Sequence, residues 1–191
     1  MDVVDTVRAS VLGHFGVPSA DSASVTFLGL EPIEILRIPD GEFVHYVTLG
    51  GARHPMTDPT AAVVDPTRGP RAELVLTLHA RRGVPAGLTR ALGVLIASPA
   101  VEGIVLQPDA LLDLGEPLWD NATFTAALLG PGDIPELPLP EPADPVRFLS
   151  VAPITATEAA WVRLRGAAAL REAWAEAGID IRDPDRGAAK L

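Results

Sequence analysis

Three short apolar runs near the start of the chain, each ended by turn-forming residues, constrain the fold more than any other feature. The runs cover residues 24–28, 33–38 and 43–49 and are rich in β-branched and aromatic side chains. Leu-Glu-Pro separates the first two runs, and Pro39-Asp-Gly41 separates the second and third. Runs of this length with proline and glycine between them are typical of antiparallel strands joined by tight turns. The sequence therefore predicts a sheet that begins with these three strands.

Helical periodicity and further strand-like runs alternate along the rest of the chain. Further strands are predicted over 73–79, 123–129 and 147–151. Apolar residues at helical spacing predict helices over 2–15, over 87–97 with an end at Ser98-Pro99, and from Thr155 to about Ala177 with a break near Gly166. Thr155 and Glu158 have the spacing of a capping box. Together these elements predict an α+β fold.

The length of the chain predicts a single domain over residues 1–191, since one core commonly grows to this size. A segment rich in Pro, Asp and Thr up to Pro70 is predicted to be a surface loop. The proline-rich segment 135–142 is compatible with a linker between two domains. An internal loop is the better interpretation, because the strand after it needs partners in the sheet and the remainder is too short to fold alone.

The charge distribution excludes several classes of partner. The net charge is −10 and the chain has a single lysine, Lys190. Phosphate backbones are bound by clustered basic residues, so direct nucleic-acid binding is not expected. Residues 91–146 hold nine carboxylates and no Lys or Arg, whereas residues 53–90 hold six arginines and three acids. Carboxylates of this kind keep loops soluble. A cluster of them is also suited to attracting a basic partner through its long-range electrostatic field.

Other absences narrow the class of protein further. The chain has no cysteine, which excludes disulfides, zinc ribbons and thiol nucleophiles. The first residues lack the basic and apolar regions of a signal peptide, and no run approaches the ~20 apolar residues of a membrane helix. We therefore expect a cytoplasmic location and no membrane partner.

The common motifs of hydrolases and nucleotide-binding proteins are also absent. The sequence contains no Gly-x-Ser-x-Gly elbow, no Gly-x-x-x-x-Gly-Lys phosphate loop and no His-Glu-x-x-His pair. His14 is predicted to have a capping or surface role on the first helix, and His54 lies in a loop. No catalytic residue, cofactor or metal ion is predicted from these residues.

His45 and His79 are the one pair that allows a chemical alternative. Both lie on predicted strands, and if these strands are neighbours then Glu73 or Asp40 could join the two imidazoles. Two histidines and a carboxylate can bind a metal ion or move a proton. The plainer alternative is that each histidine is a half-buried polar residue with a hydrogen bond.

Two further sets of side chains fit structural roles. Aspartates beside turn-forming residues are predicted to fix turns, since the other ligands and the glycine spacing of a calcium loop are missing; they are Asp58, Asp65, Asp183 and Asp185. The tryptophans are predicted to pack in the core or at its rim rather than to stack on a ligand; they are Trp119, Trp161 and Trp174.

Four sequence blocks carry a family likeness. They are Phe43-Val-His-Tyr-Val-Thr-Leu-Gly-Gly51, Arg71-Ala-Glu-Leu-Val-Leu-Thr-Leu78, Val146-Arg-Phe-Leu-Ser-Val-Ala-Pro-Ile154 with Thr155-x-x-Glu158, and Arg182-Asp-Pro-Asp-Arg-Gly187. In this order they resemble the suppressor of fused family over about residues 40–187, in its bacterial single-domain form. The resemblance implies a mixed, largely antiparallel central sheet flanked by helices. Family members often carry serine where this chain has Gly51.

The resemblance also implies a function. Animal members are cytoplasmic regulators that hold a short peptide of a transcription factor between this type of domain and a second domain, which has no counterpart here. Their binding residues are therefore not transferred to this chain. Bacterial relatives are associated with polymorphic toxin systems and are regarded as immunity proteins. An acidic surface would suit a cationic toxin.

We therefore expect a non-enzymatic cytoplasmic module that binds and regulates a protein, and more specifically an immunity protein that neutralises a basic toxin. The partner is expected to bind either to carboxylates between Glu102 and Asp144 or to an exposed strand edge, and the partner-binding residues proposed from the sequence are Asp133, Glu136, Glu141 and Asp144. One alternative is a metal-assisted hydrolase that uses His45 and His79. The other is a structural accessory protein that assembles with its own copies.

Overall fold

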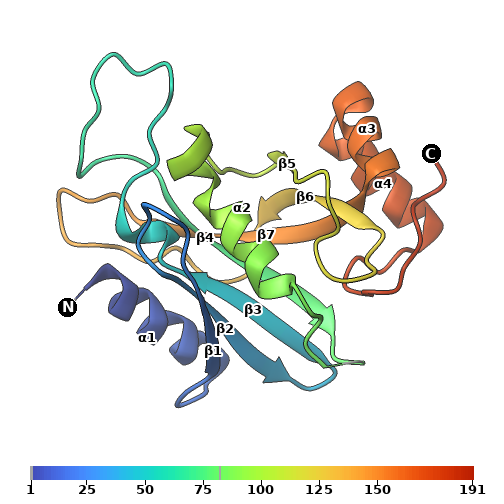
Figure 1. The fold of residues 1–191 in the computed structure, drawn as a ribbon, viewed down its shortest axis with the longest axis horizontal. Helices are drawn as coiled ribbons and strands as arrows, with labels where there is room; N and C mark the ends of the chain where they lie inside the picture. The colour runs from blue at the N-terminus through green and yellow to red at the C-terminus, as the bar shows by residue number, and fades with distance from the viewer. Residues whose placement is uncertain (1, 82) are drawn as a thin grey trace.

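A single seven-stranded sheet runs through the computed structural model, which describes residues 2–81 and 83–191 (Figure 1). The order of the strands is β1-β2-β3-β4-β7-β6-β5. β4 and β7 pair in parallel, and the other neighbours pair antiparallel. The predicted mixed, largely antiparallel sheet is confirmed. The strands are β1 Asp21–Val25, β2 Ile33–Asp40, β3 Phe43–Leu49, β4 Arg71–His79, β5 Leu111–Asp113, β6 Phe124–Pro131 and β7 Val146–Thr155.

Four α-helices flank the sheet, as predicted. A left-handed glycine ends the first helix and the last, and the third begins at the predicted capping box of Thr155 and Glu158. The predicted break at Gly166 is confirmed, because this residue separates the third helix from the fourth. The helices are α1 Val3–Phe15, α2 Leu88–Glu102, α3 Ala156–Arg165 and α4 Ala167–Ala177, and a short 3-10 turn, η1, spans Gly51–Arg53. Among the described residues, no helix has the length and apolar character needed to span a membrane.

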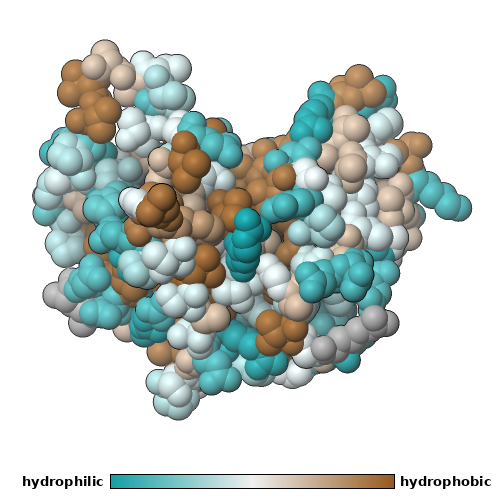
Figure 2. All heavy atoms as spheres, viewed as in Figure 1, coloured by the Kyte–Doolittle hydropathy of each residue, from teal (hydrophilic) through white to brown (hydrophobic). Residues whose placement is uncertain are grey.

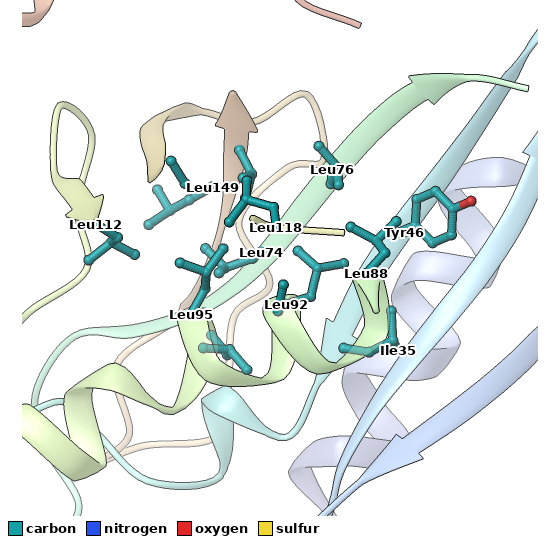
Figure 3. Packing of buried hydrophobic residues seen from close by; sticks show 14 of the residues in the cluster. Ile35, Tyr46, Leu74, Leu76, Leu88, Leu92, Leu95, Leu112, Leu118 and Leu149 are labelled. Carbon is teal, nitrogen blue, oxygen red and sulfur yellow. The ribbon is translucent and has the colours of Figure 1, made fainter. Parts of the chain in front are cut away.

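Helix α2 lies across one face of the sheet and closes the larger core (Figure 1). The predicted apolar stripe faces inward, and Leu88, Leu92 and Leu95 are each only 1% exposed. They pack in one cluster with Leu74 of β4 and Leu149 of β7 (Figure 3). Full burial of each such side chain stabilises the fold by roughly 2 kcal/mol.

The opposite face of the sheet is covered in two parts. Val7 and Val11 of α1 pack on Phe148 of β7, together with residues of β2 and β3. Helices α3 and α4 pack further along the same strand, on Ala152 and Ile154. These β7 residues alternate along the strand and therefore share one face of the sheet. The stretch of the sheet between α1 and the α3–α4 pair is left without a covering helix.

Several predicted boundaries are wrong; the strand predicted over 147–151, for example, spans Val146–Thr155. The strand predicted over 24–28 ends at Val25, because Phe27 turns away to pack over Gly93 of α2 and a turn follows it. The helix predicted to end at Ser98-Pro99 continues to Glu102, with Pro99 inside it. Proline removes only its own N–H, and the Gly103 N–H closes the next turn on the Pro99 carbonyl at 3.0 Å. The three-residue strand β5 was not predicted, since so short a run has no periodicity.

The packing around Gly51 leaves little room for a side chain. A Cβ atom at this position would lie 2.4 Å from Cγ1 and Cδ1 of Ile96 on α2 and 2.9 Å from the Ala72 carbonyl oxygen. The side chain of Ile96 thus occupies the space that a serine at position 51 would need. The packing of Ile96 against this turn therefore requires glycine at position 51.

We expect Gly51→Ser to destabilise the protein by about 2 kcal/mol, because an added side chain in a packed core costs about 1–3 kcal/mol. Ile96→Ala removes the Ile96 contact but leaves the Ala72 carbonyl oxygen, so the same serine should cost less in that background, about 1 kcal/mol. Urea unfolding of the two single variants and the double variant measures this coupling. Equal costs of the serine in both backgrounds would contradict the steric account.

Candidate functional site

A buried carboxylate on β4 organises the turn that follows β3. Glu73 is 0% exposed, and its oxygens accept hydrogen bonds from the Thr48 hydroxyl at 2.6 Å and from the Gly50 and Ala52 N–H groups at 2.9 Å each. The Thr48 hydroxyl in turn accepts the Leu74 N–H at 2.8 Å. Burial raises the pKa of Glu73 from 4.5 to about 7, although these hydrogen bonds act in the opposite direction. The end of β3 and the turn after it are thus held around the buried Glu73 side chain. We call the hydrogen bonds of Glu73 to Thr48, Gly50 and Ala52 the cradle.

Arg71 holds the other end of the same turn. Its Nη1 donates to the carbonyl oxygens of Ala52 at 2.7 Å and Arg53 at 2.8 Å, and Nη2 donates to that of Thr67 at 3.0 Å. Burial lowers the pKa of Arg71, while the charge of Asp144 acts in the opposite direction. Glu73 therefore binds the N–H groups of η1 and Arg71 binds its carbonyl groups.

A second buried ion pair fixes the C-terminal segment. Arg186 donates from Nη1 and Nη2 to the two oxygens of Glu158 at 2.8 and 3.0 Å. Glu158 also accepts the Trp174 indole N–H at 3.1 Å and the backbone N–H groups of Thr155 and Ala189 at 3.0 Å each. Burial pushes the pKa of Glu158 upward, but these donors, led by Arg186, outweigh it and the pKa is lowered. The capping box thus belongs to a larger buried network.

The tryptophans and three of the four turn aspartates have the structural roles predicted for them. Trp119 and Trp174 are each 6% exposed, and Trp161 packs partly buried beside α4. The aspartates accept hydrogen bonds from N–H groups of their own turns, two or three residues further on; these are Asp58, Asp65 and Asp183.

His45 and His79 lie on neighbouring strands and share a face of the sheet, but they bind different carboxylates. In the β3–β4 register Phe43 is opposite His79, and His45 is opposite Thr77. His79 Nε2 lies 2.8 Å from Asp180 Oδ2. The hydrogen bond from Arg182 and, to a lesser extent, this contact with His79 lower the pKa of Asp180.

The hydrogen bonds of His45 place it in a different cluster. Its Nδ1 lies 2.8 Å from the Thr77 hydroxyl, its Nε2 lies 3.3 Å from Asp40 Oδ2, and its ring stacks on Phe15 at 4.6 Å. Glu73 contacts neither histidine. Within residues 2–81 and 83–191, no group of three or more His, Asp or Glu side chains has metal-binding geometry. The arrangement required by the hydrolase alternative is therefore not assembled by these residues.

A polar groove opens over the uncovered stretch of the sheet. It has a volume of about 370 Å³. Its floor includes His45 of β3, Thr77 of β4 and Ser150 of β7. Asp40 and Asp133 contribute from two other segments, and no Lys or Arg is among the residues that line it. We call this site the polar groove.

A second hollow, of about 420 Å³, lies beside the end of α2 and has both polar and apolar residues in its lining. Ile33, Met56 and Ile96 line it. Of its polar side chains, His54 and Glu31 contact each other at 2.8 Å, and Arg53 donates to the Pro32 carbonyl oxygen. Hydrophobic side chains also stand at the tip of the loop between η1 and β4 (Figure 2), where Val63 and Val64 are among the exposed residues.

The run of nine carboxylates divides into two groups in the fold. Four of them form ion pairs with arginines that are distant in sequence, at 2.5–3.1 Å; the pairs are Asp109–Arg171, Asp113–Arg163, Glu116–Arg90 and Glu136–Arg147. The other five take part in no ion pair within the described part of the chain; they are Glu102, Asp120, Asp133, Glu141 and Asp144. The number of carboxylates in this run therefore overstates how many are free to bind a partner.

The four residues predicted to bind a partner all lie on one loop. This acidic loop, residues 132–145, connects β6 to β7, and Asp133, Glu136, Glu141 and Asp144 are exposed on it. The loop is anchored to the rest of the fold. Ile134 is buried in the cluster that contains Val7 and Val11 of α1, and the backbone of Leu137 pairs with Val146. The fold thus brings the four residues onto one anchored segment, with Glu136 already neutralised by Arg147.

Comparisons with known proteins agree on one family. A family model described as suppressor of fused protein (SUFU) matches residues 29–187. A suppressor of fused homologue from Neisseria gonorrhoeae has 21% identity and a TM-score of 0.68, and the match covers 100% of this chain and 98% of that one. The structure of a Sufu–Fu complex has 13% identity and a TM-score of 0.71, with 97% and 91% coverage.

The structure of Drosophila Suppressor of Fused is similar over part of its length. It has 15% identity and a TM-score of 0.64, and the match covers 98% of this chain but 50% of the Drosophila chain. No match was found among curated proteins. These structural likenesses show a shared fold, and the family model spans most of the sequence. The chain therefore belongs to the suppressor of fused family.

Proposed function

We propose that this protein is a non-enzymatic binding and regulatory module that holds a protein partner on its acidic loop. One similar solved structure is a Sufu–Fu complex, which supports binding of a protein as the role of this fold. The observation that carries the proposal is the set of free charges on an anchored loop. Asp133, Glu141 and Asp144 are exposed and form no ion pair among the described residues, although the charge of Asp144 also acts on Arg71.

Free carboxylates on an anchored loop are suited to recognition. An exposed ion pair already formed within the fold must be broken before either group can bind a partner, so Glu136 contributes less than the other three residues. Because the loop packs on the α1 core, binding to it does not require ordering a long flexible segment. A like-signed surface also raises the rate of association with a basic partner.

The chemistry of this surface selects a basic protein. We propose a cationic toxin that this chain neutralises as an immunity protein in the cytoplasm. We also propose that residues 1–191 act as a single domain, a view supported by one continuous sheet from β1 to β7. The acidic loop then supplies the binding surface of this domain.

Charge reversal tests the proposal by position. We expect Asp133→Lys, Glu141→Lys and Asp144→Lys, introduced together, to reduce capture of the partner from the native host at least about tenfold at low salt, because each exposed charge contact is worth about 0.2–1 kcal/mol and a reversal also adds repulsion. The matched control reverses Glu102, Glu172 and Glu176, which changes the net charge equally at exposed sites on α2 and α4. Thermal unfolding checks that both triple variants fold.

Two results would contradict the proposal. One is equal loss of capture in the loop variant and the control, which would mean that net charge alone matters. The other is capture of the same partner by both variants at the level of the wild type. Raising the salt concentration should weaken wild-type capture, since exposed charge contacts are screened over about 8–10 Å.

A further inference from the structure

The polar groove has the features of a binding site that is already formed. His45, Thr77 and Ser150 come from three adjacent strands, and the registers place Thr77 beside His45 and Val75 beside Ser150. They therefore form one continuous patch on the floor of the groove. The groove lies where neither α1 nor the α3–α4 pair covers the sheet.

The His45 ring is fixed in this groove. It is held by the Thr77 hydroxyl at 2.8 Å, by Asp40 at 3.3 Å and by stacking on Phe15 at an angle of 30°. The side chain of His45 is only 15% exposed, whereas that of Asp40 is 65% exposed. A ligand entering the groove thus meets an accessible carboxylate and an aromatic pair that is already ordered, so the two rings lose little side-chain entropy on binding.

The charges around the groove select the ligand. Its two carboxylates, Asp40 and Asp133, belong to different segments of the chain, and Asp133 takes part in no ion pair within the described residues. No basic side chain other than histidine lines the groove. A cation that donates hydrogen bonds in several directions and stacks on an aromatic ring fits this lining, and an arginine side chain has both properties.

We infer that the polar groove binds an arginine side chain of the partner, between Asp40 and Asp133 and next to the His45–Phe15 pair. The guanidinium donates to the two carboxylates, and its planar face lies against the aromatic rings. The inference rests on the proposed function for the source of the arginine. It adds a specific contact to the acidic loop, since Asp133 belongs to both surfaces.

Titration with Nα-acetylarginine amide tests the groove without the partner. We expect the imidazole NMR signals of His45 to shift and to saturate with added ligand. Asp133→Asn and Asp40→Asn should each raise the Kd about fivefold, since each removes one charge contact at an open site. Asparagine at position 40 keeps an oxygen for the His45 ring. Glu102→Gln, distant from the groove in sequence and exposed on α2, is the matched control and should leave the Kd unchanged.

The outcomes separate this inference from the proposed function. The inference that the groove binds arginine would be overturned by either of two results. One is the absence of a saturable shift of the His45 signals, and the other is asparagine variants that bind as tightly as the wild type. Equal affinity for Nα-acetyllysine amide would overturn its selectivity for arginine. If reversal of Glu141 and Asp144 leaves partner capture intact while the arginine amide still saturates His45, the groove stands and the acidic-loop proposal falls. If that reversal abolishes capture and the arginine amide does not bind, the acidic-loop proposal stands and the groove falls.

Discussion

Replacing Arg186 by leucine is expected to lower the free energy of unfolding by about 3–5 kcal/mol, the cost of removing one partner from a buried ion pair. Glu158 is 0% exposed and the Arg186 side chain is 5% exposed, so water cannot replace the lost guanidinium. The same guanidinium also donates to the Pro153 carbonyl at 2.8 Å and lies over the Phe124 ring at 4.9 Å. Urea unfolding at neutral pH measures the loss.

The control for Arg186 is an exposed ion pair of the same chemistry. Arg147→Leu breaks a contact of 2.8 Å with Glu136, but both side chains are more than half exposed, so we expect a change below about 1 kcal/mol. Adding Glu158→Leu to Arg186→Leu should recover only part of the stability, because the N–H groups of Thr155 and Ala189 then lose their acceptor. An Arg186 variant as stable as the wild type would show that the C-terminal segment is not held by this pair.

Glu73→Ala is expected to cost about 3 kcal/mol or more, because it leaves the Thr48 hydroxyl and the Gly50 and Ala52 N–H groups without an acceptor inside the fold. Each unsatisfied buried donor costs about 1–3 kcal/mol. Loss of the cradle should also free the segment around η1. Amide hydrogen exchange at Gly50 and Ala52 should therefore become faster, in addition to the lower unfolding midpoint in urea.

The same carboxyl group predicts a dependence of stability on pH. The folded protein keeps the Glu73 proton up to a pKa of about 7, while the unfolded chain loses it above about 4.5. Between these values the folded state binds more protons, so the free energy of unfolding falls as pH rises, by about 3 kcal/mol in total from this group. Glu73→Gln removes the titrating proton and should flatten this slope between pH 5 and 7. An unchanged slope in the glutamine variant would assign the pH dependence to other groups.

Much of the fold could be predicted because its signals are local. Turn residues set the limits of β2 and β3, and the capping box of Thr155 and Glu158 fixed the start of α3. The boundaries that failed depend on tertiary contacts. Phe27 leaves the sheet to pack on α2, and α2 continues past Pro99 until Gly103 ends it.

The site was less predictable, because it depends on pairing between distant segments. The acidic run from residue 91 to 146 looks uniform in sequence, yet arginines such as Arg163 and Arg171 neutralise part of it from α3 and α4. The strand register that places Thr77 opposite His45 could not be predicted from the sequence either. Glu73 carried a visible signal, a lone acid in an apolar strand, which indicates a buried polar partner rather than a ligand for His45.

Carboxyl footprinting of the complex tests the central claim most directly. A carbodiimide with an amine label modifies exposed Asp and Glu side chains, and mass spectrometry reads each position with and without the captured partner. The account predicts that the partner protects Asp133, Glu141 and Asp144, while Glu102, Glu172 and Glu176 react as in the free protein. Full labelling of the acidic-loop residues in the complex, with protection elsewhere, would contradict it.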